Sequence, residues 1–191
     1  RYGGRELENP RPIALRQCTS AAEADAVYAL QNVVRAAMPD PELFVPDTRE
    51  HIGRYLREDL CVGAWDGSRL AAYLILRYCG RTEENYAAYF DLPPEEWDHW
   101  ANADSAVVHP DYRGNVLQRK MLQAALPLLR PGIVGLGATV SPANAYSLNN
   151  ALASGFAIVC RRAMYGGHDR YLLKKKLSKK ALSVSALQCQ R

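Results

Sequence analysis

Apolar and polar residues follow two different periods along this chain, and the change between them marks out its secondary structure. Runs rich in Val, Ile, Leu and Tyr, alternating or continuously apolar, indicate β-strands. Apolar residues three or four positions apart indicate helices with one buried face. The predicted strands are residues 12–18, 60–65, 70–78, 104–108, 133–140, 156–162 and 171–175. Four helices are predicted: two begin just after residues 20 and 47, and two begin near residues 117 and 144.

Short polar motifs predict where several of these elements start. Ser20 and Glu23 have the spacing of a capping box, in which each residue bonds the backbone of the other at a helix start. Asp47 and Glu50 repeat that spacing before the second helix. The Asp-Gly pair at 66–67 lies between two apolar runs and is typical of a β-hairpin turn.

The order of these elements is β-α-α-β-β, an insertion, and then β-α-β-α-β-β. It contains no repeat and predicts an α/β fold with one mixed sheet of about seven strands and helices on both faces. We expect residues 1–10 to be a flexible lead-in, 11–177 to form one domain and 178–191 to be a basic tail. Residues 79–103 break the rhythm with six acids and five aromatic residues, and a short helix is expected to open at residues 93–96.

The net charge of +4 comes from the end of the chain. Six of the 24 basic residues follow residue 173, where no acid occurs, so the rest of the chain is slightly acidic. A lysine run can bind nucleic acid or anionic lipid, and it can equally be a solvated terminus. No aromatic residues interleave these lysines, as a surface for stacked bases requires. We therefore expect no nucleic-acid partner.

Hydropathy and cysteine usage indicate the compartment. No apolar run approaches the roughly 18 residues needed to span a bilayer, and no signal-peptide pattern is present. We expect a cytoplasmic protein with no membrane partner, either a monomer or a homodimer. The five cysteines show no CxxC spacing, which predicts reduced thiols with neither a disulfide framework nor a metal site.

The segment from Ala106 to Leu122 carries the strongest chemical signal. It combines an apolar strand, a Pro-led turn, an Arg-Gly-Asn loop and the start of an amphipathic helix. In that order, backbone N–H groups converge at the helix start, where the helix dipole adds partial positive charge. Arg113 and Arg119 flank the loop. The segment predicts an anion site, although a lone glycine loop also occurs in purely structural connections.

Two segments resemble motifs of the GCN5-related N-acetyltransferase (GNAT) superfamily. The sequence Val108-His-Pro-Asp-Tyr-Arg-Gly-Asn-Val-Leu-Gln-Arg-Lys-Met121 is similar to the family's acetyl-CoA motif, V-x-P-x-Y-R-G-x-G-L-G-x-x-L. The sequence from Asn144 to Phe156 is similar to the family's later N-x-x-S-x-x-x-x-x-x-x-G-F segment. The two occur in the family's order, and the resemblance covers roughly residues 11–175.

The resemblance implies an acetyl-CoA-dependent N-acetyltransferase that moves an acetyl group to a primary amine of a small molecule or peptide, by direct attack in a ternary complex. In this family the strand ending here at Val108 splays from its neighbour and pairs with the pantetheine arm. The pyrophosphate lies on the N–H groups of the following turn and helix. The residues implied to bind acetyl-CoA are Val107, Val108, Arg113, Gly114, Asn115, Val116, Leu117, Gln118, Arg119, Asn144 and Ser147.

Three positions depart from the family's pattern. The family usually has Gly at the positions of Val116 and Gln118, and a β-branched residue tolerates a positive φ poorly, so we expect weakened cofactor binding. Many members carry a Tyr at the position of Ala151 that reprotonates the CoA thiolate. Tyr146 is the candidate substitute, and water is the alternative. The departures keep a second function open, a catalytically weak acyl-CoA-binding or regulatory protein.

The general base and the acceptor follow less directly from the sequence. Asp104 and Ser105 on the cleft strand are the candidate catalytic residues beside Tyr146, and a solvated strand-end acid is the alternative for Asp104. Further loop candidates are His99, His168 and Tyr165, whereas His109 is expected at the surface. The acidic and aromatic insertion either lines a pocket for a cationic amine or forms a lid whose acids face water.

Overall fold

The computed structural model describes residues 12–38, 40 and 44–178. The expected lead-in and all but the first residue of the expected tail, including Cys189, lie outside them. The strands are β1 Ala14–Gln17, β2 Leu60–Asp66, β3 Arg69–Arg77, β4 Trp100–Val108, β5 Gly135–Val140, β6 Ala157–Met164 and β7 His168–Lys176. The α-helices are α1 Ala21–Ala36, α2 Arg49–Glu58, α3 Leu117–Ala125 and α4 Ala145–Ala153. Short 3-10 turns are η2 Tyr86–Tyr89, η3 Pro94–His99, η4 Pro110–Tyr112 and η5 Leu126–Leu128.

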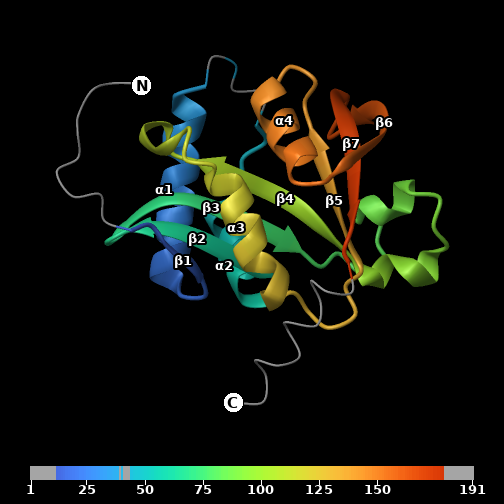
Figure 1. Ribbon diagram of the computed structural model, residues 1–191, viewed down its shortest axis with the longest axis horizontal. Helices are drawn as coiled ribbons and strands as arrows, with labels where there is room; N and C mark the ends of the chain where they lie inside the picture. The colour runs from blue at the N-terminus through green and yellow to red at the C-terminus, as the bar shows by residue number, and fades with distance from the viewer. Residues whose placement is uncertain (1–11, 39, 41–43, 179–191) are drawn as a thin grey trace.

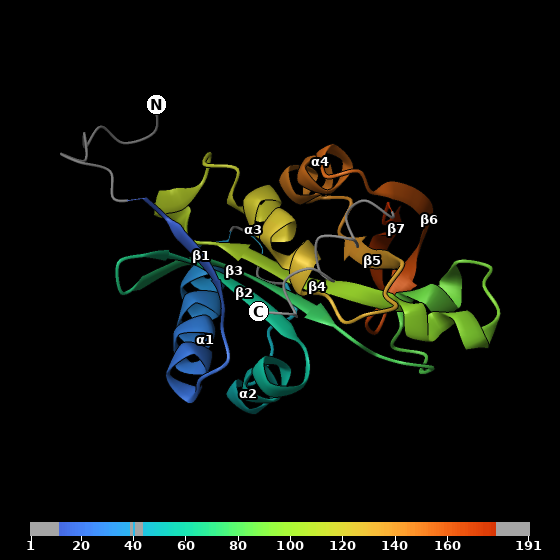
Figure 2. The same ribbon diagram turned by 60° about the horizontal axis from the view of Figure 1, so that its bottom comes forward.

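A single mixed sheet of seven strands connects these elements (Figure 1). The strand order is β1-β2-β3-β4-β5-β7-β6, and every neighbouring pair is antiparallel except β4 and β5, which run parallel. Helices α1 and α2 cover one face, and α3 and α4 cover the other (Figure 2). The predicted α/β class, strand number and placement of helices are confirmed. No helix in the described ranges is long and apolar enough to cross a bilayer.

The central strands are buried on both faces. In β3, Tyr73 and Ile75 belong to the apolar layer beneath α1 and α2, whereas Leu74 and Leu76 pack on the opposite side with Met121 of α3. Successive side chains of a strand point to opposite faces, so one strand supplies both layers. This explains why β3 is a continuous apolar run in the sequence rather than an alternating one.

The helix starts are fixed by local hydrogen bonds. The predicted capping box is present, because the Ser20 hydroxyl accepts from the Glu23 N–H at 3.3 Å and the Glu23 carboxylate accepts from the Ser20 N–H at 2.9 Å. The prediction for α2 is wrong by one residue. Thr48, not Asp47, caps this helix by accepting from the His51 N–H at 3.1 Å, because the Asp47 carboxylate accepts from the Tyr55 hydroxyl at 3.2 Å.

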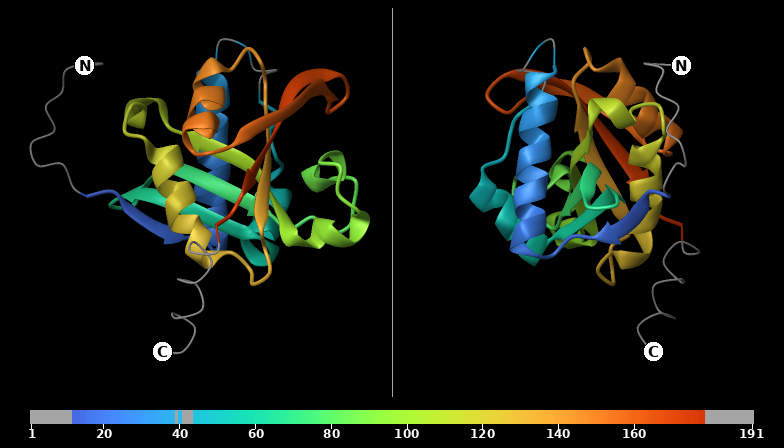
Figure 3. Two further views of the ribbon diagram at one scale, coloured as in Figure 1. Left: turned by 45° about the vertical axis from the view of Figure 1, so that its right-hand side comes forward. Right: turned by 90° about the vertical axis from the view of Figure 1, so that its left-hand side faces the viewer.

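The insertion is shorter than predicted, because β4 begins at Trp100 rather than at residue 104. The second 3-10 turn of the insertion, η3, lies where the sequence predicts a short helix. Tyr86, Phe90 and Trp100 pack with Leu172 of β7 in a separate apolar cluster, and the segment lies beside β5 in the left view of Figure 3. All six acids of the insertion are exposed. The insertion therefore buries an aromatic face and exposes its charged face to solvent.

Candidate acyl-CoA and acceptor site

Strands β4 and β5 are joined at one end and separated at the other. They pair only as far as Ala103 of β4. Towards β3, Asp104 is an extra residue, because Leu76 pairs with Ala103 and Ile75 with Ser105. Such a β-bulge bends a strand and re-aims its side chains. The gap that opens beyond the bulge matches the splayed central strands that the sequence resemblance implied.

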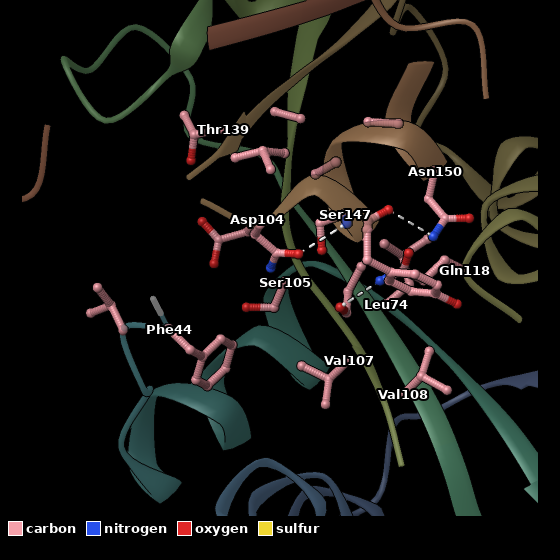
Figure 4. Close-up of a pocket in the computed structure, with 18 of the residues that line it drawn as sticks. Phe44, Leu74, Asp104, Ser105, Val107, Val108, Gln118, Thr139, Ser147 and Asn150 are labelled. Carbon is pink, nitrogen blue, oxygen red and sulfur yellow. Dashed lines mark hydrogen bonds between the residues drawn. The ribbon is translucent and has the colours of Figure 1, made fainter. Parts of the chain in front are cut away.

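A cavity of about 840 Å³ passes through this gap. Its wall includes residues of α1, α2 and the segment between them on one face of the sheet, and of α3 and α4 on the other. Figure 4 shows Asp104 and Ser105 between Phe44 on one side and Ser147 and Asn150 of α4 on the other. A cavity lined from both faces allows two different molecules to meet within the sheet.

The backbone of β4 faces this gap at Ala106 and Val108. His109 donates its N–H to the Ala71 carbonyl of β3 at 2.9 Å. In an antiparallel ladder, residues that bond the partner strand alternate with residues that point away from it. Ala106 and Val108 are in the second group. The Ala106 carbonyl accepts a hydrogen bond across the gap from the side-chain amide of Gln118 at 3.1 Å (Figure 4).

The turn after β4 delivers a bare helix start to the cavity. Gly114 has a φ of +84°, which glycine adopts at little cost. Val116 has a φ of +58° and is the N-cap of α3 without a side-chain hydrogen bond. The N-caps of α1, α2 and α4 each accept a bond from their helix. The start of α3 therefore keeps N–H groups and partial positive charge for an anion, and Arg113 lines the cavity beside it.

The structure brings most of the predicted cofactor residues together. Those that line the cavity are Val107, Val108, Arg113, Gln118, Asn144 and Ser147. Three others do not line the cavity. Leu117 is buried in the core, Asn115 donates its side-chain amide to the Tyr112 carbonyl at 3.0 Å, and Arg119 is exposed outside the lining. Gly114 and Val116 shape the turn.

Helix α4 forms the other wall of the cofactor side. The Asn144 side chain caps this helix by accepting from the Ser147 N–H at 3.0 Å. Tyr146, in the first turn, is half exposed, whereas Ala151 packs against the core, and both line the cavity. At ~100° per residue the two positions differ by about 140° around the helix. Tyr146 therefore approaches the cavity from another direction than a Tyr at position 151 would.

Asp104 of β4 lies within the gap, and a second acid, Asp47, lines the same cavity from the segment before α2. The Asp104 side chain is 17% exposed, and one oxygen lies 3.6 Å from Nη1 of Arg77. Burial raises the pKa of Asp104 to about 6, against the lowering effect of Arg77. At neutral pH such a carboxylate is mostly ionised and still basic enough to accept a proton. Ser105 is buried beside it. The alternative of a solvated strand-end acid is wrong.

The turn between β6 and β7 closes one side of the cavity. The Tyr165 hydroxyl bonds the hydroxyls of Tyr86 and Thr139, the latter at 3.0 Å. These contacts tie the turn to the insertion and to β5. Tyr165 lines the cavity, as a substrate-loop residue would. None of the acids of the insertion lines it, so the structure agrees with a lid whose acids face water.

The loop histidines lie away from the cavity. The His109 ring accepts from the Asp111 N–H at 3.1 Å, and its side chain is half-buried rather than fully exposed at the surface. The His99 ring bonds the Gly132 carbonyl at 3.0 Å, and His168 begins β7. None of the three lines the cavity. Four lining side chains carry no sequence signal because they lie far apart in the chain and outside any motif: Phe44, Tyr55, Arg77 and Arg170.

Comparison with solved structures identifies the fold. An acetyltransferase of the GNAT family from Streptococcus pneumoniae is 17% identical, with a TM-score of 0.65 over 87% of this chain and 99% of that chain. The ribosomal-protein-S18-alanine N-acetyltransferase from Escherichia coli is 16% identical, with a TM-score of 0.63 over 87% of this chain and 94% of that chain. A protein from Salmonella typhimurium, solved with its cofactor acetyl-CoA, is 16% identical, with a TM-score of 0.65 over 88% and 96%.

No family model and no curated protein matches the sequence. The chain has the fold of the GNAT acetyltransferases over nearly the whole length of these structures. At these identities the likeness establishes the fold alone.

Proposed function

We propose that this protein is an acetyl-CoA-dependent N-acetyltransferase that acts on a primary amine of a small molecule or peptide. One observation carries the proposal: a single cavity joins the open edge of β4 and the bare start of α3 to the buried carboxylate of Asp104. Structures of the same fold support it. One was solved with acetyl-CoA, and the name of another gives an alanine of ribosomal protein S18 as its acceptor.

The residues present fit two parts of acetyl-CoA. The Ala106 carbonyl faces the gap as an acceptor for an amide N–H of the pantetheine arm laid along the strand edge, which leaves the Val108 N–H free for the acetyl carbonyl oxygen. The start of α3 with Arg113 suits the pyrophosphate. Asn144 and Ser147 would contact the cofactor from α4. When bound, acetyl-CoA supplies an acetyl group activated as a thioester.

The chain's own groups then supply proton transfer and charge stabilisation. Asp104 accepts a proton from the ammonium group of the acceptor, directly or through a water, and this leaves a free amine. Ser105 orders that water. The amine nitrogen forms a bond to the acetyl carbon while the carbon–sulfur bond breaks and its electron pair goes to sulfur. The Val108 N–H donates to the carbonyl oxygen as negative charge develops there. The second proton of the amine reaches the thiolate through Tyr146 or water.

Two observations favour a second candidate, a catalytically weak acyl-CoA-binding protein. Val116 holds a left-handed conformation that a β-branched residue adopts at a cost. Ala151 lines the cavity at the position where many members of the family that the sequence resembles carry a Tyr. A protein of this kind keeps the cavity and its affinity for acyl-CoA, and lacks turnover.

Calorimetric titration with acetyl-CoA and an assay of CoA thiol release over a panel of primary amines test the proposal. We expect binding together with amine-dependent thiol release, and the acetylated amine identified by mass spectrometry. Binding without turnover of any amine favours the second candidate. The absence of binding at millimolar acetyl-CoA refutes both.

Two charge reversals provide a matched comparison. Arg113→Glu places a carboxylate beside the start of α3 and is expected to weaken acetyl-CoA binding about tenfold or more, because a charge-assisted contact is replaced by repulsion. Arg57→Glu makes the same change in an exposed residue of α2, on the opposite face of the sheet, and should leave the affinity within about twofold. Equal weakening in both variants would place the cofactor elsewhere.

A further inference from the structure

Arg170 is a buried arginine in the wall of the cavity. It is 6% exposed and lies near the start of β7. Two residues along the strand, Leu172 packs with Tyr86 and Trp100 in the cluster beneath the insertion, whereas Leu173 belongs to the core on the α3 side. Because side chains alternate along a strand, Arg170 points to the face of Leu172. That face is the acceptor side of the gap, away from α3 and α4.

No carboxylate of the described residues pairs with the Arg170 guanidinium. Its recorded hydrogen bond is from Nη1 to the Asp169 backbone carbonyl at 3.2 Å, and its guanidinium carbon lies 6.0 Å from the centre of the Tyr165 ring. The Asp169 carboxylate forms its ion pair with Arg161, and the charge of Arg170 adds only a smaller lowering of the pKa of Asp169. An arginine offers five N–H donors, so most of its donors have no partner among the described residues.

A second arginine adds positive charge beside Arg170. Arg162 lies directly opposite Arg170 in the β6–β7 ladder, and like charges in such a position destabilise a sheet. The guanidinium of Arg162 lies 4.2 Å from the centre of the Tyr89 ring, again without an acid. A buried charge without a paired anion is costly for folding. Its presence in a cavity wall is explained if a ligand brings the anion.

We propose that the acceptor carries an anionic group, specifically a carboxylate, which Arg170 binds while the amine lies towards Asp104. This inference rests on the proposed acetyltransferase function and names its substrate class, amines that bear a carboxylate. Arg170 lies in β7 and Asp104 lies at the bulge of β4, and both side chains line the same cavity. The hydroxyls of Tyr86, Thr139 and Tyr165 form the wall between the insertion, β5 and the turn.

Matched pairs of acceptors test this inference. The panel contains α-amino acids and ω-amino acids, each beside its own carboxamide, so that the position of the amine and the size of the molecule stay constant while the carboxylate is removed; the long ω-amino acids also keep the basicity of the amine nearly constant. We expect kcat/KM about 10- to 100-fold higher for the acids, because charge-assisted hydrogen bonds to an arginine are among the strong ones. The difference should appear mainly in KM, since the carboxylate is held before and during the transfer.

Variants assign the preference to Arg170. Arg170→Met should reduce the difference between acid and carboxamide to within about threefold, and Arg170→Lys should keep an intermediate preference, because it keeps the charge without the planar fork. Arg162→Met removes the exposed arginine opposite and should leave the preference intact. Thermal denaturation of each variant shows whether it folds. If Arg170→Met does not fold, the acid-to-carboxamide ratio of the wild type and of Arg170→Lys decides the question.

The results separate this inference from the function on which it rests. Carboxamides acetylated as well as the acids, or a preference that survives in Arg170→Met, overturn the inference and leave the acetyltransferase standing. A folded protein that acetylates no amine overturns both. A preference for acids that falls in Arg170→Met and persists in Arg162→Met supports both.

Discussion

Val116 occupies the left-handed region at the start of α3, with φ +58° and ψ +26°, and the substitution Val116→Gly perturbs that position alone. A residue with a Cβ pays about 1–2 kcal/mol to adopt this conformation, and branching at Cβ adds crowding. Glycine adopts it at almost no cost. The Val116 side chain is 43% exposed and belongs to none of the three apolar clusters, so removing it sacrifices little packing.

The opposing effect of this substitution is the flexibility of glycine in the unfolded chain, which costs about 0.5–1 kcal/mol. The balance is a stabilisation of about 0.5–1 kcal/mol. For a domain of this size that corresponds to a rise in Tm of about 1–4 °C. A gain in stability from glycine is unusual, because most substitutions by glycine at the start of a helix lower the stability of the protein or leave it unchanged.

Urea denaturation and thermal melting without acetyl-CoA measure the effect of Val116→Gly directly. Val116→Ala is the control, since it removes the two methyl groups but keeps the Cβ in the left-handed region. It should change the free energy of unfolding by less than about 0.5 kcal/mol. A loss of stability in Val116→Gly, or an equal gain in Val116→Ala, would refute the argument that backbone strain at this residue is the cause.

Three further predictions concern the gap and the first helix. Asp104→Asn should lower kcat by about a hundredfold or more. It should also abolish the acidic limb near pH 6 in the pH profile of kcat/KM, because Asp104 must be ionised to accept a proton. An acidic limb that persists in this variant assigns the general base to another group. Gln118→Ala should lower the Kd for acetyl-CoA about 2- to 10-fold in calorimetry by freeing the Ala106 carbonyl, and an unchanged or weaker affinity contradicts this role. Burial disfavours the Glu23 carboxylate, but the backbone N–H groups of Ser20 and its neighbour outweigh burial and lower the pKa of Glu23 to about 2. Its contribution is therefore complete well above pH 4.5 and is lost as the pH falls from about 4.5 to 2, so Glu23→Gln should cost about 1 kcal/mol in urea denaturation at pH 7 and almost nothing near pH 2.

The element order was predictable because each element carries its own local signal. The period of apolar residues marked α1 and β3, and the capping box placed the start of α1 at Ser20. The errors fall where local signals compete. Asp47 and Thr48 are both good N-caps, and only the geometry of the chain selects Thr48. The first residues of β4, from Trp100, were assigned to the insertion because its aromatic cluster hides the alternation of the strand.

The cofactor half of the candidate site was also visible in the sequence, since the turn and helix start that form it are contiguous. Residues close together in the chain, such as Arg113 and Gln118, stay close in space, so a motif can describe them. The left-handed backbone at Val116 follows from the same motif, because the position is one where the family has Gly. The acceptor half has no such motif.

The sequence by itself determined which segments become strands and helices, their order, and the glycine-bearing turn before α3, because these depend on neighbours within a few residues. Only the tertiary structure decided what faces the gap. The bulge that buries Asp104, and the burial of the Arg170 guanidinium without an ion pair among the described residues, depend on contacts between segments far apart in the chain. The Gln118 amide on the Ala106 carbonyl joins α3 to β4 across the gap. The physical reason is that burial and the pairing of charges are properties of packed surfaces, and no short stretch of chain contains such a surface.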